Sequence, residues 1–446
     1  MNEIDTRLAN RILWGLVLGA VAGSLTLLAG GLYPDLLPAA RRFSALVLDP
    51  LGQVFLRMLF FVVIPLVFAS LALGVAQLER LAQLGPLATR TFILFFLNMS
   101  IAVALGLIMM NVIEPGSAMD PEAKTRLLEE YGGTAQQHIE RQAAQPELTP
   151  MTVVDMFMPR NLFGAFVGNN RDLLGDVLPL ILFAILVGAA ATRLPSHQGA
   201  KLRSALGMVN DLMTGIVHFA LALAPYAVPA LIYSVIVKIG WDIVVALGVF
   251  VLGCILTMML HLFGTMSLWL RLLAKRRPLE FWRLIRPVLV TAFTTSSSAA
   301  TLPAALAAAR EQLGIRPSVA GFVLPLGTTM NMAGTALYEG AVVLFVAQVF
   351  GVELGYLQQL TLLLLAVLSA VAVAAIPGGS LPLIAGLLVA FGIPPEGIGI
   401  ILGVDRILDM TRTMVNVGSD VVTATVVDRY TKLGDVPTAA SDATRA

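Results

Sequence analysis

The sequence predicts an all-α integral membrane protein, and three observations support this fold class. Of the 446 residues, 57% are hydrophobic and only 13% are charged, with a mean hydropathy of +0.85, whereas soluble domains carry about 25% charged residues. Apolar runs long enough to cross a bilayer recur along the chain. Several of the later runs are interrupted by short polar stretches, as in membrane proteins whose backbone breaks inside the membrane. The net charge of +1 gives no reason to expect a nucleic-acid partner.

The first 280 residues are predicted to supply six spanning segments. A spanning helix needs about 20 apolar residues, and the second, fourth and fifth segments exceed that length, so they must tilt, bend or break. The first segment has no small-residue cleavage site close behind it, which favours a spanning helix over a signal peptide. The six segments lie at about 12–32, 45–78, 86–113, 151–192, 205–237 and 239–270.

Basic residues indicate how the chain is oriented. Arg7 and Arg11 precede the first segment, and further basic residues gather after every second segment. Because basic loops tend to stay in the cytoplasm, we expect a cytoplasmic N-terminus and a location in the inner (plasma) membrane. Arg41 and Arg42 fall on the outer side of the membrane, which is acceptable because the positive-inside rule describes only an excess of basic residues in the cytoplasm. The polar insert at 117–150 is expected to be an external excursion. The basic clusters are Arg80 and Arg90; Arg193, Lys201 and Arg203; and Arg271, Lys275, Arg276 and Arg277.

Beyond residue 280 the pattern becomes a broken apolar hairpin followed by a long helix with a polar middle, and it occurs twice. Paired, interrupted hydrophobic segments in two halves are the best sequence indication of a transporter binding site. Non-helical backbone at membrane depth survives only where protein buries it or where it lines a wet cavity. The interruptions are TTSSSAATLP (294–303), TTMNMAGT (328–335) and AIPGGSLP (375–382), and the last polar helix covers 400–427.

The last long apolar segment carries a polar stripe on one face. At roughly 100° per helical residue, its six polar side chains fall within an arc of about 100°. An ionised group at the bilayer centre costs on the order of 3 kcal/mol. The stripe therefore predicts an intramembrane site for a charged or zwitterionic ligand and cations. Two alternatives are an ion-pair network that only holds helices together and the lining of an ion channel. The stripe consists of Asp405, Asp409, Arg412, Thr413, Asn416 and Asp420.

Cysteine and histidine usage excludes several other classes of site. Cys254 is the one cysteine, so no disulfide can form within the chain. The four histidines, His138, His197, His218 and His261, are scattered and show no ligand spacing, so neither zinc nor haem is expected. No nucleophile–base pair is suggested, and we do not expect an enzyme or a bound cofactor.

Six motifs together resemble the dicarboxylate/amino acid:cation symporter family, which includes the excitatory amino acid transporters and archaeal aspartate transporters. The resemblance covers nearly the whole chain and its motifs are highly specific. They are DPLGQVFLRMLFFVVIPLVFASLALG (49–74), MPRNLFGAF (158–166), the serine-rich hairpin (294–303), NMAGTALYEG (331–340), PGGS (377–380) and DxxRTxxNVxxD (409–420).

The resemblance implies the architecture of the family. It implies eight transmembrane helices and two re-entrant helical hairpins, arranged as inverted repeats in an elevator-type transporter. It also implies a homotrimer embedded in membrane lipid. The whole chain, 1–446, would be one transporter domain. Residues 1–280 would supply the scaffold, although the third and sixth helices would belong to the transport domain, whose core would be 281–430. Residues 431–446 would form a polar tail.

The resemblance also implies which residues bind the substrate. Arg412 would receive the side-chain carboxylate of the substrate through two parallel hydrogen bonds, and Asp409 would receive the α-ammonium. Asn416, Ser298 and the backbone at the hairpin tip would hold the α-carboxylate, while Thr335 would assist at the side-chain carboxylate. The full substrate set is Ser297, Ser298, Thr335, Asp409, Arg412, Thr413 and Asn416.

Coupling ions and a gate follow from the same resemblance. The second hairpin would act as the gate, and its tip cannot continue a helix because it contains proline and two glycines. One implied Na⁺ site comprises Gly327, Asn331, Asn416 and Asp420; another comprises Thr329 and Met332; and the gate comprises Pro377, Gly378, Gly379 and Ser380.

Three departures from the family pattern bear on ion coupling. Ala333 replaces an aspartate that ligates a third Na⁺, and Asn98 and Met99 stand where archaeal relatives have hydroxyl ligands. A site that lacks this carboxylate and these hydroxyls should bind Na⁺ poorly. Glu339 is a candidate proton carrier because a buried carboxyl group can bind a proton, although pairing with a neighbouring helix is an equal alternative.

These observations predict a secondary active symporter of acidic amino acids, L-aspartate or L-glutamate, coupled to Na⁺ and/or H⁺. The first alternatives within the family are symport of C4-dicarboxylates and symport of small neutral amino acids. A dicarboxylate has no ammonium group to meet Asp409, and a neutral amino acid would leave Arg412 unpaired.

Overall fold

The computed structural model describes residues 3–62, 85–117, 177–373 and 380–431, with short pieces between 64 and 76 and between 158 and 162. Within these ranges the chain forms helices and no β-strands, in agreement with the predicted all-α class. The insert at 118–150, most of the motif at 158–166 and the tail beyond residue 431 lie outside the described residues.

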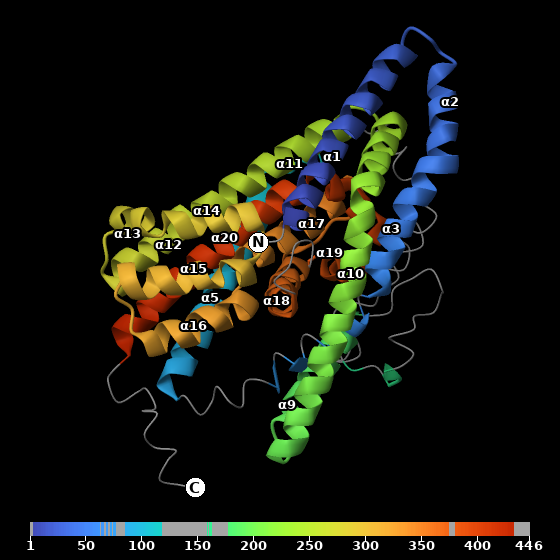
Figure 1. The fold of residues 1–446 in the computed structure, drawn as a ribbon. Helices are drawn as coiled ribbons and strands as arrows, with labels where there is room; N and C mark the ends of the chain where they lie inside the picture. The colour runs from blue at the N-terminus through green and yellow to red at the C-terminus, as the bar shows by residue number, and fades with distance from the viewer. Residues whose placement is uncertain are drawn as a thin grey trace.

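The N-terminal helices form a group along one side of the molecule (Figure 1). They are α1 (Glu3–Gly30), α2 (Leu36–Phe43), α3 (Asp49–Phe61) and α10 (Ser196–Ile239), with the π-helical turn η1 (Ser44–Leu48) between α2 and α3 and with α9 (Val177–Ala191) before α10. α1 packs directly on α10, since a side chain at Gly19 would place its Cβ 2.5 Å from the backbone oxygen of Pro229. An ion pair of 2.6 Å between Lys238 Nζ and Asp49 Oδ2 ties α10 to α3.

α10 is longer than the apolar segment that predicts it. The segment 205–237 forms most of the helix, but the polar residues 196–204 continue it toward the N-terminus. Hydropathy marks the part of a helix that contacts apolar surroundings, whereas the helical backbone itself extends wherever its hydrogen bonds continue.

Two long helical stretches flank the centre of the molecule. One is α5 (Pro86–Ile113). The other begins as α11 (Asp242–Met259) and continues through η2 (Leu260–Thr265), α12 (Met266–Trp269) and η3 (Leu270–Ala274). Among the described residues, three stretches are long and apolar enough to cross a membrane: Pro86–Ile113, Ile243–Ala274 and Pro317–Val349.

The C-terminal part contains the predicted interruptions. After α13 (Pro278–Leu284), α14 (Arg286–Thr295) and α15 (Ser298–Ala307) form a hairpin that breaks at 296–297. η4 (Ala308–Gln312) then leads to α16 (Pro317–Met330) and α17 (Ala333–Val349), which are separated at 331–332. Both breaks confirm the sequence prediction. α18 (Tyr356–Ala372) and α19 (Leu381–Ala390) flank the third interruption, of which 375–379 lie outside the described residues. η5 (Pro395–Gly397) precedes α20 (Ile398–Tyr430).

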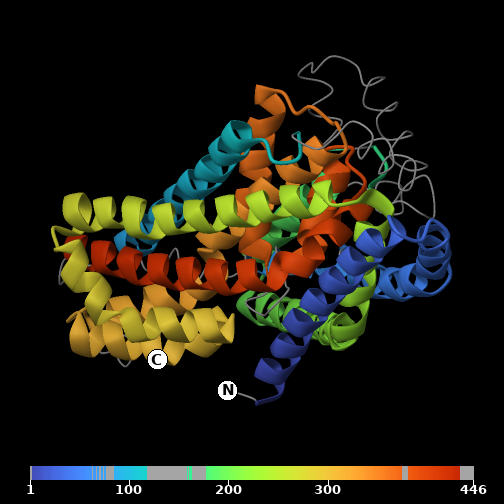
Figure 2. The same ribbon diagram turned by 90° about the horizontal axis from the view of Figure 1, so that it is seen from above.

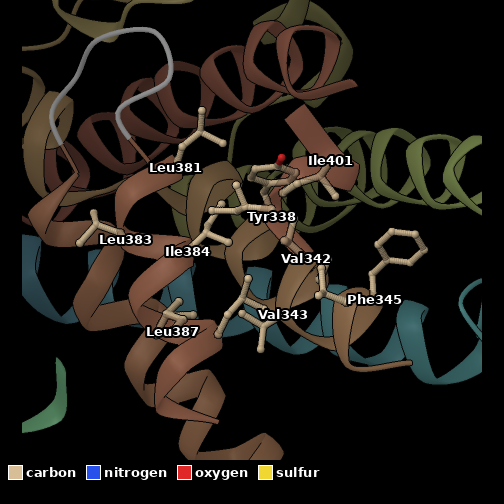
Figure 3. Close-up of a cluster of buried hydrophobic side chains, with 14 of the residues drawn as sticks. Tyr338, Val342, Val343, Phe345, Leu381, Leu383, Ile384, Leu387 and Ile401 are labelled. Carbon is tan, nitrogen blue, oxygen red and sulfur yellow. The ribbon is translucent and has the colours of Figure 1, made fainter. Parts of the chain in front are cut away.

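α17 and α20 lie at the centre of the C-terminal part. Every residue of α17 except Gln348 is buried. Its side chains Tyr338, Val342 and Val343 pack near the α19 residues Leu381, Ile384 and Leu387 (Figure 3). Figure 2 shows α20 lying between α11 and the α14–α15 hairpin. The polar face of α20 is therefore enclosed by protein rather than left to face lipid, which is the condition under which charges persist at membrane depth.

Candidate functional site

A pocket lies where the α14–α15 hairpin, the start of α17, both arms of the second hairpin and the polar face of α20 converge. It contains about 260 Å³ of space between protein atoms, part of which is open to solvent. The pocket brings together six of the seven predicted substrate residues and the last residue of the predicted gate. Its lining consists of Ser296, Ser298, Met332, Thr335, Val373, Ser380, Asp409, Arg412, Thr413 and Asn416.

Arg412 is the centre of a charged cluster at this pocket. Its guanidinium donates from Nε to Asp409 Oδ1 at 2.9 Å and from Nη1 to Asp405 Oδ1 at 3.1 Å. The Tyr338 hydroxyl donates to the same Asp405 oxygen at 2.9 Å, and the Tyr338 ring lies 4.8 Å from Arg412 Cζ. All four side chains are buried. Because a buried charge is costly unless it is paired and hydrogen-bonded, these contacts are what allows Arg412 to sit here.

Arg406 completes the cluster, and sequence reasoning missed it. Its Nη1 lies 3.5 Å from Asp409 Oδ2. With Asp405, Asp409 and Arg412 it gives two acidic and two basic side chains, which balance. Arg406 precedes Asp409 by three residues, a spacing at which helical side chains meet, so the i,i+3 pattern in the sequence contained the signal.

Asn416 connects α20 to the start of α17. Its Oδ1 accepts from the backbone N–H groups of Gly334 at 2.8 Å and Thr335 at 3.4 Å, and its Nδ2 donates to Thr335 Oγ1 at 3.1 Å. The first N–H groups of a helix have no partner within the helix. The Asn416 side chain therefore supplies from another element what an N-cap residue supplies locally.

Gly334 allows this contact, and its replacement provides a test. A Cβ there would lie 2.5 Å from the backbone oxygen of Arg412, so Gly334→Ala is expected to push α17 away from α20 and break the bond to Asn416. We expect a loss of stability of about 1–3 kcal/mol, as for other overpacking changes, measured by thermal unfolding of the purified protein.

The control is Gly207→Ala in α10, where an added Cβ meets nothing within 4 Å. This substitution should leave the melting temperature unchanged or raise it slightly, because alanine favours a helix more than glycine does. Equal melting temperatures for the two variants would contradict the close packing of α17 on α20.

The serine-rich hairpin tip presents the expected Ser298 to the pocket and, in addition, Ser296, which the sequence did not single out. Ser296 adopts a left-handed backbone conformation, with φ of 49° and ψ of 33°, and it lines the pocket with Ser298. Ser297 caps α15 instead, because its Oγ accepts from the N–H of Ala300 at 3.2 Å. The role of the Ser297 backbone stays a prediction. Ser296 was missed because a run of serines does not reveal which one turns inward.

Two buried hydroxyls of the pocket suit a polar ligand. Within the described residues, neither Ser296 Oγ nor Ser380 Oγ has a hydrogen-bond partner. A buried polar group without a partner costs about 1–3 kcal/mol, and a ligand oxygen or nitrogen in the pocket would remove that cost. Of the predicted gate, Pro377, Gly378 and Gly379 lie outside the described residues.

A second polar cluster surrounds Asp420 and contains Gly327, Asn331 and Asp420, three of the four residues of the first predicted cation site, which stays a prediction. Asn331 Nδ2 donates to Asp420 Oδ1 at 2.8 Å. A Cβ at Gly327 would lie 2.3 Å from the same oxygen, so the carboxylate packs directly on the Gly327 backbone. Within the described part of the chain Asp420 forms no ion pair. A buried carboxylate without an ion-pair partner is the kind of ligand that a hard cation prefers.

Two further polar side chains continue from this cluster. Asn98 Nδ2 donates to Asn331 Oδ1 at 2.8 Å, and Asn98 Oδ1 lies 3.0 Å from His261 Nε2. In the sequence, Asn98 stands out only as a missing Na⁺ ligand, and His261 has no neighbour at metal-ligand spacing. The residues are 163 and 233 positions away from their partners, so no local pattern could have joined them.

The remaining predicted residues are Thr329 and Met332, of the second predicted cation site, and Glu339. The Thr329 side chain is exposed and donates to the Leu326 carbonyl at 3.1 Å, while Met332 lines the pocket; their cation site stays a prediction. Glu339 is fully buried on α17. Among the described residues, neither of its oxygens makes a hydrogen bond of ordinary geometry, although the Ser369 hydroxyl is close enough to act on it.

Comparisons with known proteins find similarity along nearly the whole chain. The model of the sodium:dicarboxylate symporter family matches residues 8–430. The chain is 31% identical over 435 residues to a proton/sodium-glutamate symport protein of Bacillus subtilis, covering 96% of this chain and 94% of that protein. It is 29% identical over 436 residues to a proton/glutamate-aspartate symporter of Escherichia coli, with the same two shares of 96% and 94%. A C4-dicarboxylate transport protein of Deinococcus radiodurans is 30% identical over 413 residues, covering 92% of this chain and 87% of that protein.

These matches confirm the resemblance drawn from the motifs. The family match extends over both the N-terminal helices and the residues of the pocket. The relatives are transporters by name, and the apolar helices of the structure are those of a membrane protein. The chain therefore belongs to the sodium:dicarboxylate symporter family and is an integral membrane protein.

Proposed function

We propose that the protein is a secondary active symporter that carries L-aspartate or L-glutamate together with Na⁺ and/or H⁺. The observation that carries this proposal is the buried Arg412 beside Asp409 at a small pocket lined with hydroxyls. A guanidinium binds a carboxylate with two parallel hydrogen bonds, and a carboxylate pairs with an ammonium group. Arg412 would receive the substrate's side-chain carboxylate and Asp409 its α-ammonium, while Ser298 and Asn416 would hold the α-carboxylate.

Charge balance supports coupling to cations. The cluster of Asp405, Arg406, Asp409 and Arg412 carries no net charge when all four are ionised, so an acidic amino acid brings one negative charge into the protein. Asp420 adds another without an ion-pair partner among the described residues. Uncompensated charges are expensive away from water, and bound cations at Asp420 would offset them.

The structure also supports a second candidate substrate class. The sequence argument against C4-dicarboxylates rests on Asp409, which would face no ammonium group. Arg406 lies 3.5 Å from Asp409 Oδ2 and partly neutralises it, so a dicarboxylate would meet less repulsion than the sequence suggested. The Deinococcus radiodurans relative is named for C4-dicarboxylates. Acidic amino acids remain the favoured class because they pair with both Asp409 and Arg412.

We further propose the family architecture for this chain: eight spanning helices, two re-entrant hairpins, inverted repeats and a homotrimer in the plasma membrane, with a cytoplasmic N-terminus. Residues 1–280 would contribute the scaffold, with α5 and the α11–η3 stretch belonging to the mobile part, and residues 281–430 would be its core. The repeated order of a helical pair followed by a longer helical stretch, first α14–α17 and then α18–α20, supports this proposal.

The test is uptake of radiolabelled aspartate and glutamate into liposomes containing the purified protein. Na⁺, pH and membrane-potential gradients are imposed separately, and unlabelled succinate and alanine are added as competitors. Saturable, gradient-driven uptake with competition by acidic amino acids supports the proposal. Stronger competition by succinate would instead favour the C4-dicarboxylate class. Current without saturable uptake would indicate a channel and reject symport.

Glu339 gives a prediction for proton coupling. Because an unpaired ionised carboxylate in the protein interior costs several kcal/mol and both Glu339 oxygens lack ordinary hydrogen bonds within the described residues, we expect Glu339 to carry a proton during transport. Uptake should respond to an inward proton gradient, and Glu339→Gln should remove this response while sparing substrate binding. The measurement is liposome uptake at fixed Na⁺ with a varied external pH.

Glu353→Gln is the matched control, since Glu353 is exposed between α17 and α18 and should keep the full response. A Glu339→Gln variant that still follows the proton gradient would rule out Glu339 as the carrier.

We also expect a Na⁺ dependence shallower than in relatives with aspartate at position 333, because the side chains of Ala333 and Met99 offer no oxygen ligand.

A further inference from the structure

A chain of four buried polar side chains leads from α20 across the molecule to η2. It begins at Asp420 and passes through Asn331 and Asn98 to His261, with successive contacts of 2.8, 2.8 and 3.0 Å. Each of these side chains is 2% exposed or less. Asn331 Nδ2 also lies 3.4 Å from the buried Ser419 hydroxyl, a group that can either accept or donate. The donor or acceptor role of each group therefore limits the role of the next group in the chain.

The donor and acceptor atoms of the four side chains set the direction of the hydrogen bonds between them. An ionised carboxylate only accepts, so the Asn331 atom facing Asp420 is Nδ2 and the atom facing Asn98 is Oδ1. Asn98 must then donate from Nδ2, which leaves its Oδ1 toward His261. Since that oxygen can only accept, His261 carries its proton on Nε2. His261 Nδ1 has no partner within the described residues.

A cation at Asp420 would impose the opposite direction. Na⁺ requires oxygen ligands, and the Nδ2 group of Asn331 occupies the side of the carboxylate where such a ligand would be needed. Rotating the Asn331 amide by half a turn exchanges its nitrogen and oxygen without moving the backbone. Its Nδ2 would then donate to Asn98, so Asn98 must rotate as well and donate from Nδ2 to His261.

We propose that His261 and Asn98 are positioning residues of cation coupling, because a cation that takes Asn331 Oδ1 at Asp420 replaces the Asn331–Asp420 hydrogen bond and reverses the two hydrogen bonds beyond it. This inference rests on the proposed cation site at Asp420. At the far end, His261 Nε2 changes from donor to acceptor. One proton leaves Nε2 and one is gained at Nδ1, so the ring stays neutral and the protein's proton count does not change. Because Nδ1 makes no hydrogen bond to the described residues, protonating it breaks none of the contacts seen there.

The hydrogen-bond chain joins four separate elements of the structure. Asp420 lies on α20 and Asn331 at the break before α17, whereas Asn98 lies on α5 and His261 on η2. In the reversed chain both hydrogen bonds beyond Asn331 remain and the cation joins Asn331 to Asp420, so cation binding does not release these elements from one another. His261 must be able both to donate and to accept for this to hold. A side chain that only donates, or only accepts, would favour one direction.

The test is nitrogen NMR of the full-length protein in lipid nanodiscs with ¹⁵N-labelled histidine. The four histidines are few enough to assign His261 by loss of its signal in His261→Gln. Spectra are recorded at pH 8, above the usual histidine pKa of about 6.5, in choline chloride and then in saturating NaCl. Saturation is judged separately from Na⁺-dependent thermal stabilisation, which follows cation binding by mass action. We expect the His261 proton on Nε2 in choline and mainly on Nδ1 in Na⁺.

A substitution that interrupts the hydrogen-bond chain at Asn98 provides the matched comparison. Asn98→Leu should leave the His261 signal insensitive to Na⁺, whereas Asn111→Leu, which removes another amide from α5, should keep the response. Na⁺-dependent stabilisation without any change of the His261 tautomer in the unmodified protein would overturn the reversal while leaving the cation site standing. The absence of stabilisation by Na⁺ would reject the cation site and the reversal together. A response that survives in Asn98→Leu would also overturn the proposal, because it could not travel through Asn98.

Discussion

Replacing Arg412 by alanine is expected to abolish uptake of acidic amino acids and to leave some binding of neutral ones. Arg412 is the only basic side chain that lines the described pocket, and it is the proposed partner of the substrate's side-chain carboxylate. Removing one member of a buried charged contact typically costs about 2–5 kcal/mol, which corresponds to more than tenfold in affinity. The measurement is liposome uptake of aspartate, together with binding of aspartate and alanine to the purified variant.

The same substitution leaves Asp405 and Asp409 without their guanidinium, so stability must be followed at the same time. Asp405→Asn in the Arg412→Ala background should recover part of the lost thermal stability but none of the aspartate uptake. Arg412→Lys keeps the charge but loses the fork that binds a carboxylate in two places, and it should weaken aspartate binding as well. Unchanged aspartate affinity in Arg412→Ala would show that the carboxylate binds elsewhere.

The second large effect is expected from joining the two hairpins across the pocket. Ser296 and Ser380 both line the pocket, one from the first hairpin and one from the second. With Cys254→Ala as background, Ser296→Cys and Ser380→Cys are introduced together and linked by a thiol-specific reagent. Because the proposed gate must separate from the first hairpin to admit a substrate, we expect transport to stop in the linked protein.

Each single cysteine variant, treated with the same reagent, serves as the control for modification alone. A reducible linker allows recovery of uptake to be tested in the same sample. Full uptake by protein shown to be linked on a denaturing gel would reject the gating role of the second hairpin.

Much of the architecture of this site follows from local sequence patterns. The breaks at 296–297 and 331–332 lie within the predicted polar interruptions, because serine, asparagine and glycine interrupt an apolar helix wherever they cluster. The face shared by Asp409, Arg412 and Asn416 follows from helical periodicity, which depends only on spacing within α20. The third interruption stays a prediction, because most of its tip lies outside the described residues.

By itself, the sequence determined the membrane class, the family, the places where the helices break and the residues that share the polar face of α20. These properties depend on composition, on motifs and on spacing within one element. Only the tertiary structure decided which atoms pair: Tyr338 with Asp405, Ser296 rather than Ser297 toward the pocket, and Asn98 between Asn331 and His261. Such contacts join residues far apart in the chain, and they depend on how each helix is rotated against its neighbours. That rotation is set by packing of the whole core, so no single segment of the sequence contains it.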